Sequence, residues 1–506
     1  MCGLCHHPAC DGLDHFRASS GDESNASAVG ANTPIDQIIT QLNRGDASWN
    51  TSFPVTYSFA NVVPNYAFGE DEYLGFHSFN EQQEIMARLA LSTWGDVADI
   101  SFVETYPGTG IISFANSSTL AQYSAAHAYL PTEGSWGGDV WVNSAWDFNT
   151  NPQIGDYGFK VIVHEIGHAI GQPHPGDYNA GGARLSYENN AAYAEDSQQY
   201  SIMSYWDEEN TGADFSGYYA QTPMLHDIAA IQAKYGANMT TRTGDTVYGF
   251  NSNTESELFN FTRNEKPVLS IWDAGGEDTL DFSGFAEDVV LDLNPGAFSS
   301  AAGMVNNISI AYGADIENAV TGVGDDTIVG NMLDNVVDAG DGTDTFVVNL
   351  DQEDAAVYVF DTRPILVHSD HGIDQLTSVE TISFTDLDLD VASLHHVSLL
   401  EYAASHADVA AYYGTDEDLL YQHFVEHGLS EGRTIDFSAM AYIASHQDLI
   451  EVFGTDAEAG ALHFLEFGLS EGRSITFDET AFLDANPELI DIHGTNLNAA
   501  QLYIEM

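Results

Sequence analysis

The chain has 506 residues, which is too long for one hydrophobic core, so we expect roughly three or four structural units. Its 77 acidic and 12 basic residues give a net charge of −65, which excludes nucleic acids and anionic membranes as partners and favours cations. No apolar stretch approaches the roughly 18 residues of a membrane-spanning helix, and we expect a monomer without a membrane span.

Residues 1–34 are expected to form a leader. The first twenty residues lack the basic and apolar regions of a Sec signal peptide, and the rest is rich in Ser, Asp, Asn, Ala and Gly, as is typical of a mobile segment. All three cysteines of the chain, Cys2, Cys5 and Cys10, lie in this leader. No disulfide can therefore form from position 11 onward, and stability outside a cell must come from packing and metals.

Residues 35–238 have the pattern of a globular α+β domain. The spacing of apolar residues predicts helices over residues 35–45 and 81–94. Short or alternating apolar runs predict strands at residues 55–59, 100–103, 111–114 and 139–143. The last of these is either an edge strand, on which an extended peptide could dock, or a core strand.

Residues 164–174 read HEIGHAIGQPH and carry the strongest chemical signal in the chain. His164 and His168 are four residues apart, so on a helix their imidazoles project from one face and can share a metal ion. Gly171 falls where this helix must end and turn, which suits a residue that tolerates positive φ. His174 then returns as a third nitrogen ligand.

Three neutral imidazoles with one open position are the ligand set of a catalytic zinc ion, not of a structural one. Glu165 lies beside these ligands and is placed to hold a water. Zinc would polarise a carbonyl and lower the pKa of this water toward ~7, while Glu165 would take its proton and pass it to the leaving amine. The pattern therefore predicts one catalytic zinc ion and hydrolysis without a covalent intermediate.

The motif at residues 164–175, HEIGHAIGQPHP, is followed at residues 201–206 by SIMSYW. Together they resemble the metzincin zinc endopeptidases, and specifically the serralysin branch, over most of residues 35–347. The resemblance implies a secreted enzyme that hydrolyses protein or peptide substrates. It also implies that Met203 packs beneath the zinc ligands and that Tyr205 is a fifth, displaceable zinc ligand whose hydroxyl binds the oxyanion.

Residues 239–392 form a second expected domain, with three consecutive nonapeptides over residues 321–347. Each places Asp or Asn sixth and an apolar residue eighth, the pattern of a parallel β-roll whose glycines form turns and whose aspartates bind Ca²⁺. Successive turns lie on opposite sides of such a roll, so the first and third loops stack. One calcium site is therefore expected from Gly322, Gly324, Asp326, Gly340, Gly342 and Asp344. The middle loop has Asn335 and lacks the corresponding glycines, so the opposite side should bind calcium weakly or not at all.

The resemblance to serralysins implies further calcium ligands ahead of the roll, namely Arg242, Gly244, Thr246, Asp273, Gly275, Gly276, Asp278 and Glu317. Several structural Ca²⁺ ions would offset the self-repulsion of the acidic chain. Adaptation to saline surroundings explains the general acidity equally well, but it does not explain the ordered spacing of Gly and Asp.

Residues 393–506 contain a different repeat, with a period of 40 residues. Each copy is expected to hold two short helices, which makes this module all-α. The expected caps and ends of the second helices are Thr415, Thr455, Gly428 and Gly468. The equivalent histidines, His423 and His463, are expected to be structural, and adhesion to a surface or polymer is one hypothesis for the module.

Two functions fit these features. The first is a secreted, calcium-stabilised zinc endopeptidase, exported without a Sec signal peptide. The alternative is a calcium-dependent surface or adhesion protein with an incidental protease domain. The intact set of zinc ligands with Glu165 favours the first.

The leader thiols allow three hypotheses. One thiolate could occupy the water position on the zinc and keep a precursor latent, as in cysteine-switch proenzymes. A separate small metal site and free thiols in a mobile tail are the alternatives.

Overall fold

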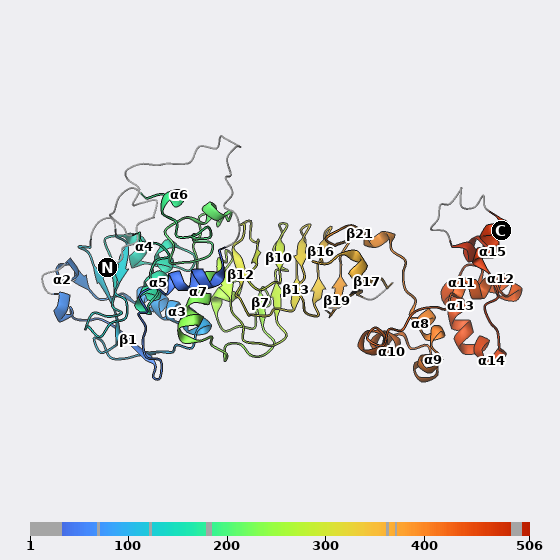
Figure 1. Ribbon diagram of the computed structural model, residues 1–506. Coiled ribbons are helices and arrows are strands. Elements are labelled where there is room, and N and C mark those ends of the chain that lie inside the picture. Colours follow the sequence, from blue (N-terminus) through green and yellow to red (C-terminus); the bar gives the residue numbers. More distant parts are fainter. Residues whose placement is uncertain are drawn as a thin grey trace. The chain divides into compact units, whose positions relative to one another are not determined.

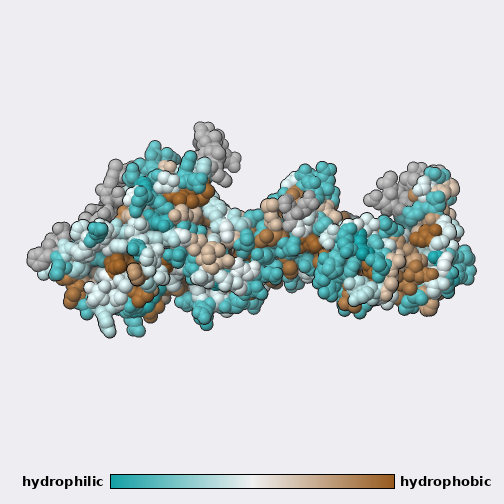
Figure 2. All heavy atoms as spheres, turned by 60° about the horizontal axis from the view of Figure 1, so that its bottom comes forward, coloured by the Kyte–Doolittle hydropathy of each residue, from teal (hydrophilic) through white to brown (hydrophobic). Residues whose placement is uncertain are grey.

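The computed structural model describes residues 33–67, 71–120, 124–178, 185–360, 364–369, 372–486 and 498–506. The chain forms two compact units, residues 1–354 with 371–392 and residues 355–370 with 393–506 (Figure 1). The leader thiols Cys2, Cys5 and Cys10 lie outside the described residues, so their role stays a prediction. No helix in the described ranges is long and apolar enough to span a membrane. Figure 2 shows that hydrophilic residues cover much of one face, in keeping with the acidic composition.

A mixed sheet is the framework of the N-terminal part of the first unit (Figure 1). Its strands run in the order β3 (Phe102–Glu104), β1 (Val55–Phe59), β4 (Ile112–Ser117), β6 (Val140–Asn143) and β5 (Ala126–Ala128), and β2 (Phe76–His77) pairs with β4. The pairs from β3 to β6 are parallel, whereas β5 and β2 are antiparallel to their partners. Because β6 lies between two strands and is buried throughout, the strand predicted at residues 139–143 is a core strand, and β5 forms the edge.

Helices pack around this sheet, and the predicted helices over residues 35–45 and 81–94 are confirmed. The longer helices are α1 (Ile35–Leu42), α3 (Glu81–Val97), α5 (Tyr157–Ala169) and α7 (Leu225–Tyr235). In α3, Trp94 donates its indole N–H to the carbonyl of Val163 at 3.0 Å, which ties this helix to α5. The short helical turns are α2 (Asp71–Leu74), α4 (Asp147–Thr150), α6 (Tyr187–Asn190) and the 3₁₀ turns η1 (Asn65–Ala67), η2 (Glu208–Thr211), η3 (Glu257–Phe259), η4 (Gln352–Asp354) and η5 (Val391–Ser393).

The C-terminal part of the first unit is a roll of two sheets (Figure 1). One sheet contains the parallel strands β7 (Val247–Gly249), β9 (Thr279–Asp281), β13 (Asn318–Val320), β15 (Val336–Asp338) and β19 (Gly372–Thr377). The other contains β10 (Val290–Asp292), β14 (Thr327–Val329), β16 (Thr345–Val347), β20 (Thr381–Ser383) and the antiparallel β21 (Asp388–Asp390). A small third sheet is formed by β11 (Phe298–Ser299), β12 (Ile308–Ile310) and β8 (Leu269–Ile271).

The three nonapeptides supply β14, β15 and β16, and they alternate between the two large sheets as predicted. The eighth residue of each repeat, Ile328, Val337 and Phe346, points into the core and is at most 1% exposed. The parallel β-roll predicted from the sequence is therefore confirmed. Its register also brings the first and third loops together on one side, because β14 pairs directly with β16.

The second unit combines a β-hairpin with short helices. The hairpin is formed by β17 (Ala355–Tyr358) and β18 (Ile365–Ser369). The first helical copy contains α8 (Leu399–Ser405), α9 (Ala407–Tyr413), α10 (Glu417–His423) and the π-helical turn η6 (Phe424–Gly428). The second contains α11 (Ala439–Ala444), α12 (Gln447–Phe453), α13 (Ala457–His463), η7 (Phe464–Gly468) and α14 (Leu469–Glu471), and the third α15 (Glu479–Ala485) and α17 (Ala499–Glu505).

Each of the first two copies thus begins with three short helices rather than the predicted two. The predicted caps were wrong by one residue. Asp416 and Asp456, not Thr415 and Thr455, accept the backbone N–H three residues ahead. A carboxylate at the N-cap position also favours the positive end of the helix.

The predicted helix end is confirmed at Gly428, which is the last residue of η6, but it was wrong at Gly468, because α14 follows η7 directly. A Cβ at Gly428 would lie 2.6 Å from the hydroxyl of Tyr402, so close packing explains this glycine. The same hydroxyl bonds His423 Nδ1 at 2.8 Å, and the equivalent pair in the second copy, Tyr442 and His463, is 3.0 Å apart. These contacts agree with the predicted structural role of the two histidines.

Candidate active site

The helix α5 presents the first two histidines of the motif. It begins after Asp156, whose side chain accepts a hydrogen bond of 2.8 Å from the N–H of Phe159. Just beyond its end, Gly171 turns the chain with a φ of +102°. A Cβ at this position would lie 2.1 Å from the carbonyl oxygen of Ala47, so only glycine fits. The turn directs the chain toward His174.

The imidazoles of His164, His168 and His174 converge on one point, and all three are buried. The distances between their Nε2 atoms are 3.1 Å for His164–His168, 3.2 Å for His168–His174 and 3.3 Å for His164–His174. Tetrahedral zinc with Zn–N bonds of 2.0–2.1 Å requires ligand nitrogens about 3.3–3.4 Å apart. The residues therefore fit a zinc ion.

Backbone carbonyls set the tautomer of each ring. Nδ1 of His164 lies 2.6 Å from the carbonyl oxygen of Ile202, Nδ1 of His168 lies 2.6 Å from that of Gln172, and Nδ1 of His174 lies 3.0 Å from that of Tyr178. A carbonyl only accepts, so each Nδ1 carries the proton and each Nε2 keeps its lone pair for a metal.

Burial keeps the three rings neutral, which is the form that binds metal. Desolvation lowers the pKa of His168 to about 4. It also lowers the pKa of His164 and of His174 well below the ordinary value, and the neighbouring imidazoles reinforce this shift. A positive charge in this cluster is disfavoured at neutral pH.

Glu165 is fully buried beside the ligands, and neither of its carboxylate oxygens has a hydrogen-bond partner among the described residues. Burial raises its pKa well above the ordinary value, and the positive charge of Lys160, five residues earlier in α5, opposes this shift. Burial also lowers the pKa of Lys160 to about 8. A buried carboxyl without a partner beside a metal-ligand cluster is the arrangement of a general base.

The SIMSYW segment packs against the histidine cluster. Met203 is fully buried, and a Cβ at Gly167 would lie 2.6 Å from its sulfur, so Gly167 makes room for the methionine beneath α5. Tyr205 is 4% exposed, and its ring centroid lies 4.3 Å from that of His174. Both residues therefore lie beside the candidate zinc ligands.

Two buried aspartates, which the sequence pattern did not predict as site residues, hold this region together. Asp227 in α7 accepts hydrogen bonds of 2.6 Å from the hydroxyl of Ser201 and from the N–H of Ile202, the residue whose carbonyl orients His164. Asp196 accepts bonds from the hydroxyls of Tyr178, at 2.8 Å, and Ser204, at 2.7 Å. A charged residue inside the apolar run MLHDIAAI was the one sequence signal for Asp227.

A cavity of about 560 Å³ adjoins the histidines at the end of the edge strand β5. It is lined by Arg44, Ala47, Ala128, Tyr129, Leu130, Pro131, Thr132, Trp136, His168, Pro173, His174, Gly176, Asp177 and Tyr178. Glu72 fixes this strand from the side, because its Oε1 lies 3.1 Å from Nε2 of His127 and accepts a bond of 2.9 Å from the hydroxyl of Tyr129. The edge strand thus forms one wall of a cleft at the candidate metal centre.

Comparison with known proteins agrees with this geometry. The family model described as Matrixin matches residues 65–189, and the model described as Peptidase M10 serralysin C terminal matches residues 237–450. "Metalloprotease AprA" of Pseudomonas entomophila is 43% identical over 343 residues, which is 64% of this chain and 70% of that protein. The chain belongs to the serralysin branch of the metzincin metalloproteases.

Further serralysin-type relatives match over a similar range. "Metallopeptidase AprA" of Pseudomonas marginalis is 44% identical over 317 residues, which is 60% of this chain and 66% of that protein. "Serralysin B" of Dickeya chrysanthemi is 46% identical over 322 residues, 61% of this chain and 66% of that protein. The chain therefore spans 66–70% of the length of these relatives.

The residues that serralysin resemblance marks as calcium ligands form two adjacent loops before the roll. The side chain of Asp278 accepts a bond of 2.7 Å from the N–H of Thr246, and a Cβ at Gly276 would lie 2.7 Å from the carbonyl carbon of Gly244. Glu317 joins them, because its carboxylate accepts a bond of 2.7 Å from the N–H of Asp278. The expected ligands in the two loops therefore lie together. The first loop holds Arg242, Gly244 and Thr246, and the second holds Asp273, Gly275, Gly276 and Asp278, with Glu317 beside them.

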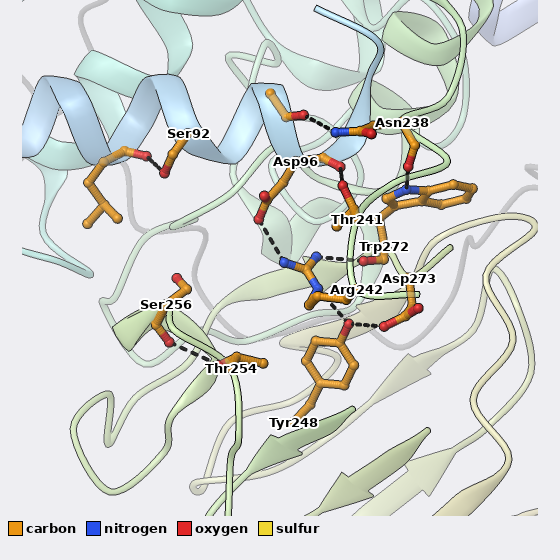
Figure 3. Close-up of polar contacts among 12 residues, drawn as sticks. Ser92, Asp96, Asn238, Thr241, Arg242, Tyr248, Thr254, Ser256, Trp272 and Asp273 are labelled. Carbon is orange, nitrogen blue, oxygen red and sulfur yellow. Dashed lines mark hydrogen bonds and ion pairs between the residues drawn. The ribbon is translucent and has the colours of Figure 1, made fainter. Parts of the chain in front are cut away.

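Arg242 anchors these loops to the catalytic part (Figure 3). Its guanidinium forms an ion pair of 2.8 Å with Asp96 in α3, donates to the hydroxyl of Tyr248 at 2.8 Å and donates to the carbonyl of Trp272 at 2.6 Å. Tyr248 in turn donates to Asp273 at 2.5 Å. The side chain of Arg242 is therefore engaged in the structure, and only its carbonyl remains as a candidate calcium ligand.

The first and third loops of the roll stack closely. Cβ atoms at Gly340 and Gly342 would lie 2.1 Å and 2.0 Å from the carbonyl oxygens of Gly322 and Gly324, so these turns require glycine. The sixth residues also connect, as Asp344 accepts a bond of 2.8 Å from the N–H of Asp326. The six residues expected to form one site are thus brought together.

Two aspartates, one in the loops before the roll and one in the roll, each have a carboxylate oxygen without a hydrogen-bond partner within the described residues. Oδ2 of Asp278 and Oδ2 of Asp344 are buried and accept no hydrogen bond within the described residues. Burial raises the pKa of Asp278 to about 7, with Asp273 and Glu317 adding to the shift. Burial likewise raises the pKa of Asp344 to about 6, with a contribution from Asp326. The donor set of carboxylates and glycine carbonyls fits Ca²⁺.

The middle loop is built differently. The side-chain amide of Asn335 donates to the carbonyl of Glu317 at 2.9 Å and to Oδ1 of Asn331 at 2.8 Å, and its oxygen accepts the N–H of Asn331 at 3.0 Å. Hydrogen bonds from the Asn335 amide thus satisfy the carbonyl of Glu317 and Oδ1 of Asn331 in the middle loop. In the third loop, by contrast, Oδ2 of Asp344 has no hydrogen-bond partner within the described residues.

Proposed function

We propose that this protein is a secreted zinc-dependent endopeptidase that hydrolyses protein or peptide substrates. The observation that carries the proposal is the convergence of three neutral imidazoles, with Nε2 atoms 3.1–3.3 Å apart, beside the unpaired carboxyl of Glu165. Membership of a metalloprotease family supports it. The complete ligand set also disfavours the alternative of an adhesion protein with an incidental protease domain.

In the proposed mechanism, His164, His168 and His174 hold one zinc ion. Bound zinc would supply Lewis-acid polarisation of the scissile carbonyl and activation of a water. Glu165 accepts the proton of the attacking water and then delivers it to the leaving amine, a role that suits a buried carboxyl whose pKa is raised. Tyr205, whose ring packs against that of His174, would serve as a fifth ligand and would donate its hydroxyl to the oxyanion.

The proposed substrate is an extended peptide segment that adds to the edge strand β5. This strand has a free edge in the described part of the sheet, and the cavity of about 560 Å³ lies where it reaches the histidines. Pairing through the backbone would admit many sequences. The cavity walls, including Leu130 and Trp136, would then select among side chains.

Casein digestion by the Glu165→Gln variant tests the mechanism. The substitution keeps the shape of the side chain but removes the base, so the rate should fall by about 10²–10⁴-fold. Glu81→Gln, which removes an exposed carboxylate from α3, serves as the matched control and should retain full activity. Zinc content is measured for each protein. Equal proteolysis by zinc-loaded Glu165→Gln would overturn the assigned mechanism.

We further propose that Ca²⁺ ions are structural cofactors of the loops before the roll and of its stacked first and third loops. The buried, unpaired Oδ2 atoms of Asp278 and Asp344 support this. Calcium sites of extracellular modules bind in the range of about 10⁻⁴–10⁻³ M, so such a fold suits a secreted protein that has no cysteine beyond position 10.

A monomeric state and latency through Cys2, Cys5 or Cys10 also stay predictions. Gel filtration with light scattering measures the first. For the second, single Cys→Ser precursors should show early activity if a thiolate blocks the zinc. If all three variants stay latent, the switch hypothesis fails.

A further inference from the structure

Arg44, two residues after α1, binds the loop that carries the third histidine. Its guanidinium donates to three consecutive carbonyls, those of His174 at 2.7 Å, Pro175 at 2.6 Å and Gly176 at 2.9 Å. It also forms an ion pair of 3.2 Å with Asp177. One side chain thus contacts four successive residues, beginning with a candidate zinc ligand.

The rest of the same segment holds the turn that leads into this loop. Gln41 donates to the carbonyl of Pro175 at 2.6 Å, and Trp49 donates its indole N–H to the carbonyl of Ala169, the last residue of α5, at 2.8 Å. Between them, Ala47 packs against Gly171 closely enough to exclude a Cβ. Residues 41–49 therefore enclose the chain from the end of α5 to the third histidine.

The chemistry of these contacts explains why an arginine stands here. A loop that has left its helix carries carbonyls without intrahelical donors, and the planar guanidinium offers five N–H donors in fixed directions. A lysine offers one ammonium on a flexible stem, so it cannot bind three separate carbonyls with the same geometry. The side chain of Arg44 is 31% exposed, and its direction is set by the carbonyls as well as by Asp177.

We propose that Arg44 is a positioning residue for zinc: it fixes residues 174–177 so that the imidazole of His174 stays in reach of the ion held by His164 and His168. The inference rests on the zinc site proposed above. Groups that orient metal ligands typically change metal affinity by 10–100-fold when they are lost. Loss of Arg44 should therefore weaken zinc binding by about that factor while leaving the two ligands on α5 in place.

Zinc release provides the first test. The zinc-loaded full chain is mixed with a chromogenic chelator, and release is followed for wild type, Arg44→Met, Arg44→Lys and Arg88→Met. Arg88 is a matched control, because it also carries ion pairs on the surface of the catalytic part, with Glu84 and Glu104, and is 39% exposed. We expect release about 10–100-fold faster in Arg44→Met, an intermediate rate in Arg44→Lys and the wild-type rate in Arg88→Met. Wild-type release from both Arg44 variants would overturn the proposal.

Thermal unfolding separates positioning from a general loss of stability. If Arg44 only stabilises the fold, its loss lowers the unfolding temperature equally with and without zinc, and this result would overturn the proposal. If it positions His174, the increase in unfolding temperature on adding zinc becomes smaller in the variants. Arg44→Lys keeps the test available if Arg44→Met does not fold.

Failure of this inference can be told from failure of the proposed function. A wild-type protein that binds no zinc, or cleaves casein without Glu165, contradicts the proposed function. If the wild-type protein binds zinc and requires Glu165, and the Arg44 variants still release zinc at the wild-type rate, only the proposed role of Arg44 is contradicted.

Discussion

The histidines of the candidate zinc site and the loops proposed to bind calcium differ in how their ligand atoms are satisfied before an ion binds. Each imidazole donates Nδ1–H to a carbonyl and is kept neutral by burial, so the ligands carry no unpaired charge without the metal. The loops before the roll and the stacked loops of the roll instead bury carboxylate oxygens of Asp278 and Asp344, respectively, that accept no hydrogen bond within the described residues. A neutral, hydrogen-bonded site can fold before its metal binds. A site of unpaired carboxylates depends on the cation to offset their charge.

Of the predictions that follow, removal of either calcium or zinc alone should give the largest difference in unfolding temperature between the two kinds of site. Without calcium the roll loses its counter-ions, and each site that binds only the folded state contributes about 2.7 kcal/mol when free calcium is a hundred times its Kd. Zinc removal leaves neutral, satisfied ligands, so it should abolish proteolysis while lowering the unfolding temperature far less. Thermal unfolding of the calcium-free and the zinc-free proteins measures both effects.

Metal analysis of each sample is the necessary control, since chelators that remove calcium can also remove zinc. An unfolding temperature that does not depend on calcium would contradict the proposed role of the loops. A zinc-free protein that loses as much stability as the calcium-free one would contradict the contrast between the two kinds of site.

The two kinds of site also differ in how far the sequence predicts them. The three proposed zinc ligands and the proposed base fall within eleven residues, and a helical period with one glycine turn is enough to place them. The nonapeptide register is equally local, so the stacking of Asp326 with Asp344 could be predicted. Arg44 and Asp227 could not, because they act through backbone groups 130 and 25 residues away in the chain.

Strand order and the exact helix caps are two further features that the sequence does not predict. The strand at residues 139–143 has the same local pattern whether it lies in the core or at the edge, and its pairing with β4 and β5 decides. In the C-terminal copies the period of 40 residues reveals the repeat, but Thr and Asp are adjacent and both are good caps. Only the backbone conformation selects Asp416 and Asp456.

A pair of opposite substitutions at equivalent positions sharpens the comparison inside the roll. Asp344→Asn should destabilise the calcium-loaded protein, because a ligand is lost, yet stabilise the calcium-free protein by removing an unpaired buried charge. Asn335→Asp should destabilise the calcium-free protein by about 1–3 kcal/mol, because it loses the two N–H donors to Glu317 and Asn331. Urea unfolding in both conditions measures these changes.

The decisive observation is that Asp344→Asn changes the stability of the protein in opposite directions with and without calcium. A variant that is destabilised equally in both conditions would show that the position has only a packing role. Asp338→Asn, an exposed change at the end of β15, controls for the general effect of removing one negative charge from a chain of net charge −65.

The pH dependence of stability should give the smallest effect. The slope of the unfolding temperature against pH should also have opposite signs with and without calcium. Without calcium, burial raises the pKa of Asp278 to about 7 and of Asp344 to about 6, against about 3.9 for an unfolded aspartate. Their contribution to stability is complete below about pH 4 and is lost as the pH rises through 6 to 7. The unfolding temperature of the calcium-free, zinc-loaded protein should therefore fall over this range.

With calcium bound, ionised carboxylates are the favoured form, so the unfolding temperature should rise over the same range as protons stop competing with the cation. Other buried carboxyls, such as Asp227 with a pKa raised to about 6 by burial, contribute equally in both conditions and cancel in the difference. The measurement is therefore the difference in slope between calcium-loaded and calcium-free protein, with zinc saturating so that the histidines stay neutral. Parallel slopes would mean that the unpaired oxygens of Asp278 and Asp344 do not face the cation, and the contrast with the zinc ligands would fail.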